Sequence, residues 1–140
     1  MGTMINSIRN YFIDCPLMEN RKINVDYLGL EANQFTIDIT PTETVLTRYA
    51  DGGALKQYIF TIGSREYYNA DVINNIENSG FYEVFSAWIE EQNNISNLPV
   101  LPLDKQAMEI ETTTSGYLFG VDEDTARYQI QLRLTYYEDK

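Results

Sequence analysis

The chain of 140 residues contains no histidine and a single cysteine, Cys15. Histidine is the commonest general base and metal ligand near neutral pH, so its absence excludes Ser-His-Asp and Cys-His catalysis. One cysteine excludes an intramolecular disulfide, and without histidine it leaves no donor set for zinc. Cys15 also falls on the apolar side of a predicted helix, which favours a buried structural thiol over a reactive one.

Several other signals of function are missing. The sequence has no phosphate-binding glycine motif, no signal-peptide pattern and no apolar run of about 20 residues, so we expect no cofactor and no membrane. Basic residues are few, 10 against 21 acidic, which gives a net charge of −11. Such a chain repels phosphate backbones, so sequence-specific nucleic-acid binding is not expected. An acidic surface is equally a simple route to solubility.

Carboxylates alone could still carry glycosidase-type chemistry, because that reaction needs no histidine. The compact acidic clusters are Glu90-Glu91 and the pair Asp122 and Asp124. Both are typical of solvated ends of helices and strands, and Asp122-x-Asp124 lacks the glycine and later glutamate of a calcium loop. We therefore predict that the protein is not an enzyme.

The most regular stretch of the chain lies near its end. Between Ala126 and Tyr137, apolar and polar residues alternate, which predicts a long strand with one apolar face and one polar face. The polar face is a ribbon of Arg127, Gln129, Gln131, Arg133 and Thr135. If that ribbon is open to solvent it could contact an acidic neighbour; if helices cover it instead, Tyr128 and Tyr136 come to the surface.

The rest of the chain predicts helices and further strands. An apolar stripe indicates a helix over 4–15, capped by Thr3 and ended by Pro16. Residues 69–92 have helical composition, but Asn78-Ser79-Gly80 is expected to divide them, with Ser79 capping a second helix whose stripe is Phe81, Val84, Phe85, Trp88 and Ile89. Extended segments are expected around 23–27, 35–40, 108–111 and 116–121.

A tight hairpin is predicted where Ala50-Asp51-Gly52-Gly53-Ala54 separates two extended runs, 45–49 and 55–62. Asp and Gly supply the positive φ angles that such a turn needs. Separate groups of strands and helices indicate an α+β fold with a mostly antiparallel twisted sheet and helices packed on one face. Length and the lack of a composition break predict a single domain over 1–140, with 1–3 interpreted as an added segment before a natural start at Met4.

Six segments in serial order carry a family resemblance: Ser64–Tyr68, Asn78–Tyr82, Trp88–Asn93, Leu98–Pro102, Gly116–Phe119 and Ala126–Gln131. In this order they resemble small structural proteins of tailed phages and prophages of Gram-positive bacteria, called minor capsid or tail-terminator-like proteins. The resemblance extends from about Tyr27 to Tyr137. It implies a mixed fold with a twisted sheet and helices on one side, in agreement with the pattern of the residues.

The resemblance implies a tail terminator that forms a homo-oligomeric ring, usually a hexamer, on the head-proximal end of the tail tube. Such a ring stops tube growth and joins the tail to the head connector, so its expected location is the virion, after the host cytoplasm. The alternatives are a head-completion, connector or minor capsid component and, third, a small acidic interaction module or DNA-mimic inhibitor.

Ring closure requires two different patches of each subunit to meet. The eleven tyrosines suit such contacts, although sheet propensity explains them as well. The residues that we expect to contribute to an assembly interface are Tyr49, Asp51, Gly52, Gly53, Arg127, Gln129, Gln131 and Arg133.

Overall fold

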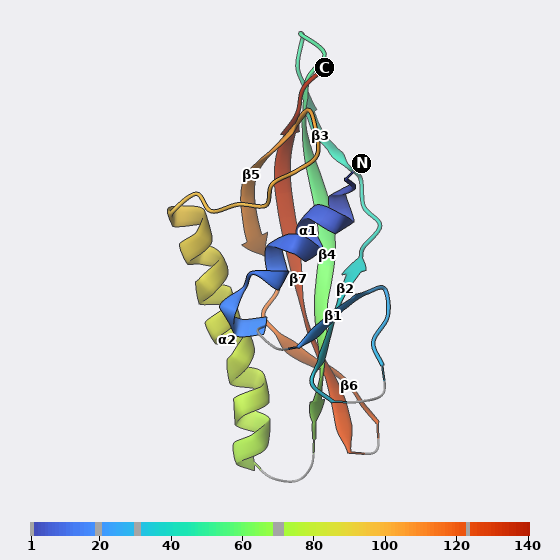
Figure 1. The fold of residues 1–140 in the computed structure, drawn as a ribbon, viewed down its shortest axis with the longest axis vertical. Coiled ribbons are helices and arrows are strands. Elements are labelled where there is room, and N and C mark those ends of the chain that lie inside the picture. Colours follow the sequence, from blue (N-terminus) through green and yellow to red (C-terminus); the bar gives the residue numbers. More distant parts are fainter. Residues whose placement is uncertain (1, 19–20, 30–31, 69–71, 123) are drawn as a thin grey trace.

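Two long antiparallel strands form the axis of the molecule (Figure 1). β4 (Ala54–Tyr67) and β7 (Thr125–Glu138) have fourteen residues each and pair along their whole length, from Ala54 opposite Glu138 to Tyr67 opposite Thr125. The structure is a computed structural model that describes residues 2–18, 21–29, 32–68, 72–122 and 124–140, with the side chains of 72–74 left aside. The described strands form one seven-stranded sheet, as an α+β fold requires.

Five shorter strands flank this pair. On one side, β2 (Gln34–Ile39) and β3 (Val45–Arg48) pair antiparallel with β4, and β1 (Lys22–Val25) runs parallel to β2. On the other side, β5 (Lys105–Thr112) and β6 (Tyr117–Asp122) pair antiparallel with β7. The sheet is therefore mostly antiparallel, as predicted. The expected strands at 23–27, 35–40, 108–111 and 116–121 correspond to β1, β2, β5 and β6.

The register divides the sheet into two levels. At the level of Gly63–Arg65 of β4, the strand order is β1-β2-β4-β7-β6. At the level of Ala54–Lys56, it is β3-β4-β7-β5. Each level ends in its own pair of edge strands, β1 and β6 at one and β3 and β5 at the other. Figure 1 shows these levels at opposite ends of the long axis.

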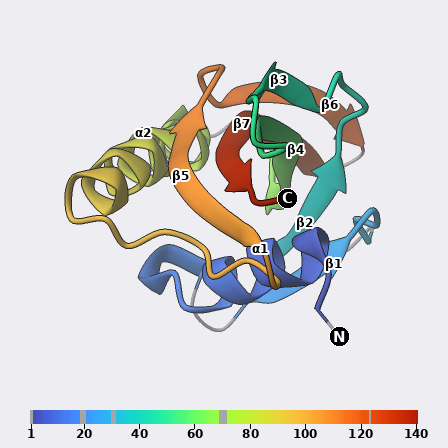
Figure 2. The ribbon, with the colours of Figure 1, turned by 90° about the horizontal axis from the view of Figure 1, so that it is seen from above.

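Both helices lie on one side of the sheet (Figure 2). They are α1 (Met4–Ile13) and α2 (Val72–Asn94), and a single 3₁₀ turn (Pro16–Met18) follows α1. The core between helices and sheet contains aromatic rings in mutual contact, with Phe12 of α1 lying 6.0 Å from Phe60 and 5.8 Å from Phe85 between ring centroids. Packing of both helices on one face of the sheet agrees with the prediction.

β7 alternates as the sequence predicts. Its apolar side chains are all buried, namely Ala126, Tyr128, Ile130, Leu132, Leu134 and Tyr136, while the residues between them are partly exposed. Burial of Tyr128 and Tyr136 shows that the apolar face meets the helices. The ribbon of polar side chains consequently lies on the face that neither helix covers.

The predicted hairpin joins β3 to β4. The amide of Tyr49 donates to the carbonyl of Gly53 (2.8 Å), and the amide of Gly52 donates to the carbonyl of Tyr49 (3.1 Å). Gly52 has φ +94°, a conformation that glycine adopts without steric cost. The carboxylate of Asp51 accepts from the amide of Gly53 (2.9 Å), which closes an Asx turn.

α1 begins where the sequence predicts. The Thr3 hydroxyl accepts a hydrogen bond from the amide of Asn6 (3.3 Å), which satisfies one of the free N–H groups of the first turn. The helix ends at Ile13, two residues before the predicted end. Cys15 lies outside it but is buried, and burial raises the pKa of its thiol, as expected for a structural cysteine.

The expected division of the second helical region is wrong. α2 continues through Asn78-Ser79-Gly80, and Ser79 caps no helix. A helical glycine costs about 1 kcal/mol relative to alanine, which the burial of Tyr82, Phe85 and Ile89 on the next turns offsets. The predicted start at 69–71 and the side chains of Val72 and Ile73 lie outside the described residues.

The apolar stripe of α2 also differs in one position. Val84 is exposed, and the side chain that faces the sheet in its place is Tyr82. The Tyr82 hydroxyl hydrogen-bonds to the Ser64 hydroxyl (2.6 Å) and donates to the carbonyl of Tyr128 (3.1 Å). A tyrosine interrupts the apolar pattern in the sequence, but its polar tip has partners on β4 and β7, so it can be buried without loss. Burial raises the pKa of Tyr82 well above its usual range.

Two glycines give a matched test of this packing. A Cβ on Gly80 would meet no atom within 4 Å, whereas a Cβ on Gly116 would overlap the Cβ and ring of Tyr82. We expect Gly80→Ala to raise the free energy of unfolding by roughly 1 kcal/mol, since alanine has the higher helix propensity. Gly116→Ala should lower it by about 1–3 kcal/mol through overpacking. Urea unfolding measures both; a stabilising Gly116→Ala would contradict the packing of Tyr82.

Candidate assembly surface

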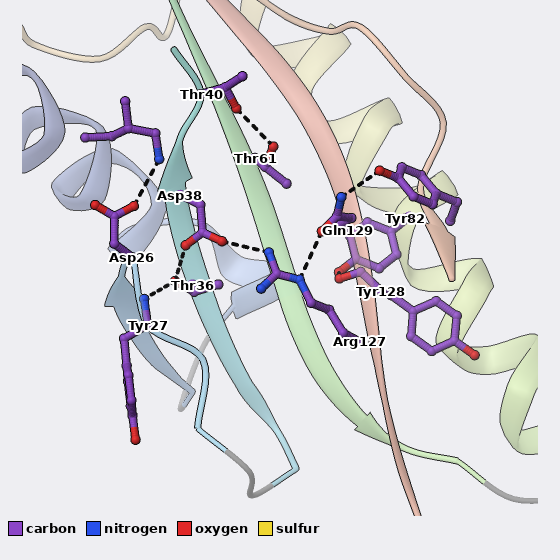
Figure 3. A network of polar contacts seen from close by, with 12 residues as sticks. Asp26, Tyr27, Thr36, Asp38, Thr40, Thr61, Tyr82, Arg127, Tyr128 and Gln129 are labelled. Carbon is purple, nitrogen blue, oxygen red and sulfur yellow. Dashed lines mark hydrogen bonds and ion pairs between the residues drawn. The ribbon is translucent and has the colours of Figure 1, made fainter. Parts of the chain in front are cut away.

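Arg127 is the centre of a polar network on the open face of the sheet (Figure 3). Its Nη2 donates to the carboxylate of Asp38 (2.7 Å), its Nε donates to Gln129 (3.0 Å), and its guanidinium lies 5.5 Å from the ring centroid of Phe119. Asp38 also accepts from the Thr36 hydroxyl (2.8 Å). Four strands, β2, β4, β7 and β6, are therefore joined across this face, because Arg127 spans β4 at Gly63, where a side chain would collide with it.

Arg133, Gln129 and Gln131 of the ribbon also form ion pairs or hydrogen bonds with side chains of this chain. Arg133 forms an ion pair with Glu111 of β5, and its Nε donates to that carboxylate (2.8 Å). Gln129 donates to the Tyr117 hydroxyl (2.6 Å), and Gln131 donates to the Thr113 hydroxyl (3.1 Å). The two arginines and two glutamines of the ribbon thus each have a partner within the chain.

The charges of the ribbon are consequently neutralised inside the subunit. Both arginines have a carboxylate partner, Asp38 or Glu111. A contact with an acidic neighbour would have to compete with these pairs, which weakens the prediction that the ribbon attracts such a neighbour. Reversing the charge of either arginine would also place two carboxylates together and act on the fold itself.

The hairpin residues form a second group at the far end of the molecule. Tyr49 is exposed, and its ring lies 6.0 Å from that of Tyr137, which packs against Gly53 so closely that no Cβ fits there. The turn of Asp51 and Gly52 lies beside the C-terminus (Figure 1). Arg65, the residue opposite Arg127, follows Ala54 by eleven residue steps along β4, which is about 36 Å at 3.3 Å per residue. The structure does not bring the two predicted groups together.

An edge strand presents unpaired main-chain groups, which proteins usually cover. The edge of β5 is covered, because the side-chain amide of Asn93 on α2 bonds both main-chain groups of Ile110: Nδ2 donates to the carbonyl, and Oδ1 accepts from the amide (2.8 Å). In the described part of the chain, the one side chain from another element that bonds to the main chain of β6 is Thr125 of β7, whose hydroxyl donates to the carbonyl of Asp122 (3.4 Å) at the last residue of the strand. Of the two edge strands that pair with β7, β5 is thus covered by a helix side chain and β6 is not.

β6 is also the most apolar exposed strand. Its exposed large side chains are Tyr117 (44%), Leu118 (42%), Phe119 (61%) and Val121 (53%). Burying the exposed part of each of these side chains in a complex would stabilise that complex by roughly half of the ~1.5–3 kcal/mol that full burial of such a side chain provides. Sequence reasoning identified the strand but missed this surface: a run that is apolar on both faces suggests a central strand, and only the pairing shows that it is an edge.

The opposite edges contain two exposed basic residues. Lys22 begins β1 and Arg48 ends β3, and neither forms an ion pair with any residue that the structure describes. Among the described residues, the one side chain from another element that bonds to the main chain of β1 is Arg9 of α1, whose Nε donates to the carbonyl of Ile23 (2.9 Å). Both edges also expose an apolar residue, Val25 on β1 and Leu46 on β3.

Charge is distributed unevenly along the chain. Residues 71–124, which include α2, β5 and β6, contain eleven acidic residues and one basic residue, so this segment holds a net −10 of the total −11. The rest of the chain is close to neutral. The segment 71–124 is therefore strongly acidic, while β1 and β3 present Lys22 and Arg48, which have no ion pair among the described residues.

Nothing in the described residues forms a metal-binding group of three or more His, Cys, Asp or Glu side chains. Within the same ranges, no helix combines the length and apolar character that crossing a bilayer requires. Comparison with models of known protein families and with curated proteins gave no match for this chain.

The role of Arg127 in the fold can be tested with a second arginine as control. Arg127→Glu removes the pair with Asp38 and places two carboxylates together at a partly buried site, so we expect a loss of about 1–3 kcal/mol in the free energy of unfolding. Arg48→Glu changes the same charge at an exposed site that has no ion pair with any described residue, and it should stay within about 0.5 kcal/mol. Equal losses in denaturant unfolding would refute the network.

Glu138 gives a test by pH. Hydrogen bonding and charge from Lys56 (3.0 Å), with further help from Lys105 (3.4 Å), lower the pKa of this carboxyl. A depressed folded-state pKa stabilises the fold above the unfolded value, and that contribution disappears as pH falls through the folded value. We expect Lys56→Met to raise the pKa of Glu138 in an NMR titration. Its stability deficit, below about 1 kcal/mol for so exposed a pair, should vanish in acid.

Proposed function

We propose that the protein is a structural subunit of a phage virion, a tail terminator that forms a ring on the head-proximal end of the tail tube. In this role it halts tube growth and joins the tail to the head connector. The observation that carries the proposal is the exposed, apolar edge of β6 together with the edges of β1 and β3, whose Lys22 and Arg48 have no ion pair among the described residues. Edges of this kind favour association, and proteins that stay monomeric usually block them.

Two different open edges are what a ring needs. A closed cyclic assembly is built from a heterologous contact, in which one patch of each subunit meets another patch of the next. The acidic segment that contains β6 and the edges of β1 and β3, which present Lys22 and Arg48, are complementary rather than alike. Steering between unlike charges favours head-to-tail contacts and disfavours contacts between two like edges.

The dimensions of the subunit also suit an assembly. Its accessible surface is 8103 Å², against roughly 7,500 Å² expected for a compact chain of 16.2 kDa. The excess comes with the elongated shape, in which β4 and β7 extend beyond the helices (Figure 1). The projecting β3–β4 hairpin and the C-terminus offer a surface at one end of the long axis for a neighbour above or below the ring.

The proposal is tested by solution mass. Size-exclusion chromatography with light scattering, alone and with purified tail tubes of the cognate phage, should show a homo-oligomer, and negative-stain images should show rings or capped tubes. The same preparation is then mixed with purified head-connector rings.

Each result assigns a role. Capping of tubes supports the terminator; binding to connector rings without tubes would replace it with a head-completion or connector role. A monomer that ignores both and competes with DNA for a basic protein would instead indicate an acidic interaction module, and the assembly proposal would then be wrong.

A further inference from the structure

We infer that neighbouring subunits join by β-strand addition, with β6 of one copy pairing antiparallel to β1 of the next so that Asp122 lies opposite Lys22. This inference rests on the proposed ring and specifies its subunit contact. The occupant of the open β6 edge is therefore a second copy of this chain, which presents its β1 edge.

The levels of the sheet favour this pair of strands. β6 and β1 end the same level, so copies joined through them stay at one height along the long axis, as a closed ring requires. β6 and β3 end different levels, and joining them would shift each copy along the axis and produce a spiral. β5 is covered at both main-chain groups of Ile110 by Asn93, whereas on β1 Arg9 of α1 bonds only the carbonyl of Ile23 and would have to release it when the strands pair.

Strand direction agrees as well. β6 runs parallel to β4, whereas β1 and β2 run against β4. Two copies with their long axes pointing the same way therefore bring β6 and β1 together antiparallel. The antiparallel ladder is the slightly more stable arrangement.

One register matches the two faces of the sheet. On β1, Lys22 and Asn24 lie on the open face and Ile23 and Val25 on the helix face; on β6, Gly120 and Asp122 lie on the open face and Leu118 and Val121 on the helix face. Placing Lys22 opposite Asp122 puts Ile23 opposite Val121 and Asn24 opposite Gly120. The bulge between Leu118 and Gly120 then brings Val25 to Leu118, so like faces meet at each position.

Charge supports the same contact and opposes its alternative. Lys22 and Asp122 are both exposed, and neither has an ion-pair partner within the described part of the subunit. A symmetric contact between two β6 edges would bring together two segments of net charge −10 each. Repulsion between like charges disfavours that dimer.

The contact can be tested by cross-linking. Residues opposite each other in an antiparallel pair have Cα atoms about 4.5–5.5 Å apart, within the range for a disulfide. The double variant K22C/D122C, oxidised after assembly on tail tubes, should give a ladder of covalent oligomers on a non-reducing gel. K22C and D122C alone should remain monomeric, because the native Cys15 is buried and the contact needs both edges. R48C/D122C, which tests β3 as the partner edge, should also give no ladder.

A second variant pair tests the edge without cysteines. Val121→Lys places a charge on the β6 edge and should weaken self-association about tenfold or more. Val84→Lys makes the same change at the equally exposed Val84 of α2 (55% against 53%) and should leave self-association unchanged. Native circular dichroism of both variants checks that they fold.

The outcomes separate this inference from the proposed function. If the wild type forms rings, any of four results would overturn the β6–β1 contact and leave the ring in place. They are no ladder from K22C/D122C, a ladder from R48C/D122C, dimers from D122C alone, or equal assembly of Val121→Lys and Val84→Lys. A wild type that never associates, alone or on tubes, would overturn both.

Discussion

The fourteen-residue pairing of β4 with β7 is the constraint on which the rest of the structure depends. Side chains of a strand alternate between two faces, so this pairing places one apolar row of each strand against α1 and α2 and leaves the other row on a face without helices. Each long strand is also longer than any of its outer neighbours. Its outer side is therefore shared by two short strands, and the sheet acquires two levels with four edges in place of two.

The open face of the sheet is stabilised by charge and hydrogen bonding instead of by helix packing. Arg127 and Arg133 each pair with a carboxylate of a neighbouring strand, and the glutamines between them bond to hydroxyl groups across the sheet. Such pairs hold β2, β5 and β6 in place beside the long strands. They also neutralise the two arginines of this face. The edges differ, because β6 is apolar and Lys22 and Arg48 have no ion pair among the described residues.

Local patterns in the sequence were reliable where neighbours in the chain decide the structure. The alternation of 126–137, the Asp-Gly-Gly turn and the Thr3 cap all depend on adjacent residues, and all three were predicted. The division of α2 at Gly80 was predicted wrongly, because a weak local signal of about 1 kcal/mol is smaller than the burial of Tyr82, Phe85 and Ile89 on the distant sheet. Tyr82 was missed for the same reason: its partners, Ser64 and Tyr128, lie 18 and 46 residues away.

The sequence by itself determined the class of the fold, the two faces of β7 and the acidic balance, since composition and a period of two need no knowledge of long-range contacts. The tertiary structure decided which strands are edges, which charges are neutralised and how far apart the predicted residues lie. Strand order brings Asp38 to Arg127 across 89 residues and leaves Lys22 and Asp122 at opposite edges of one level. These relations arise from pairing between segments distant in the chain, which no local pattern records.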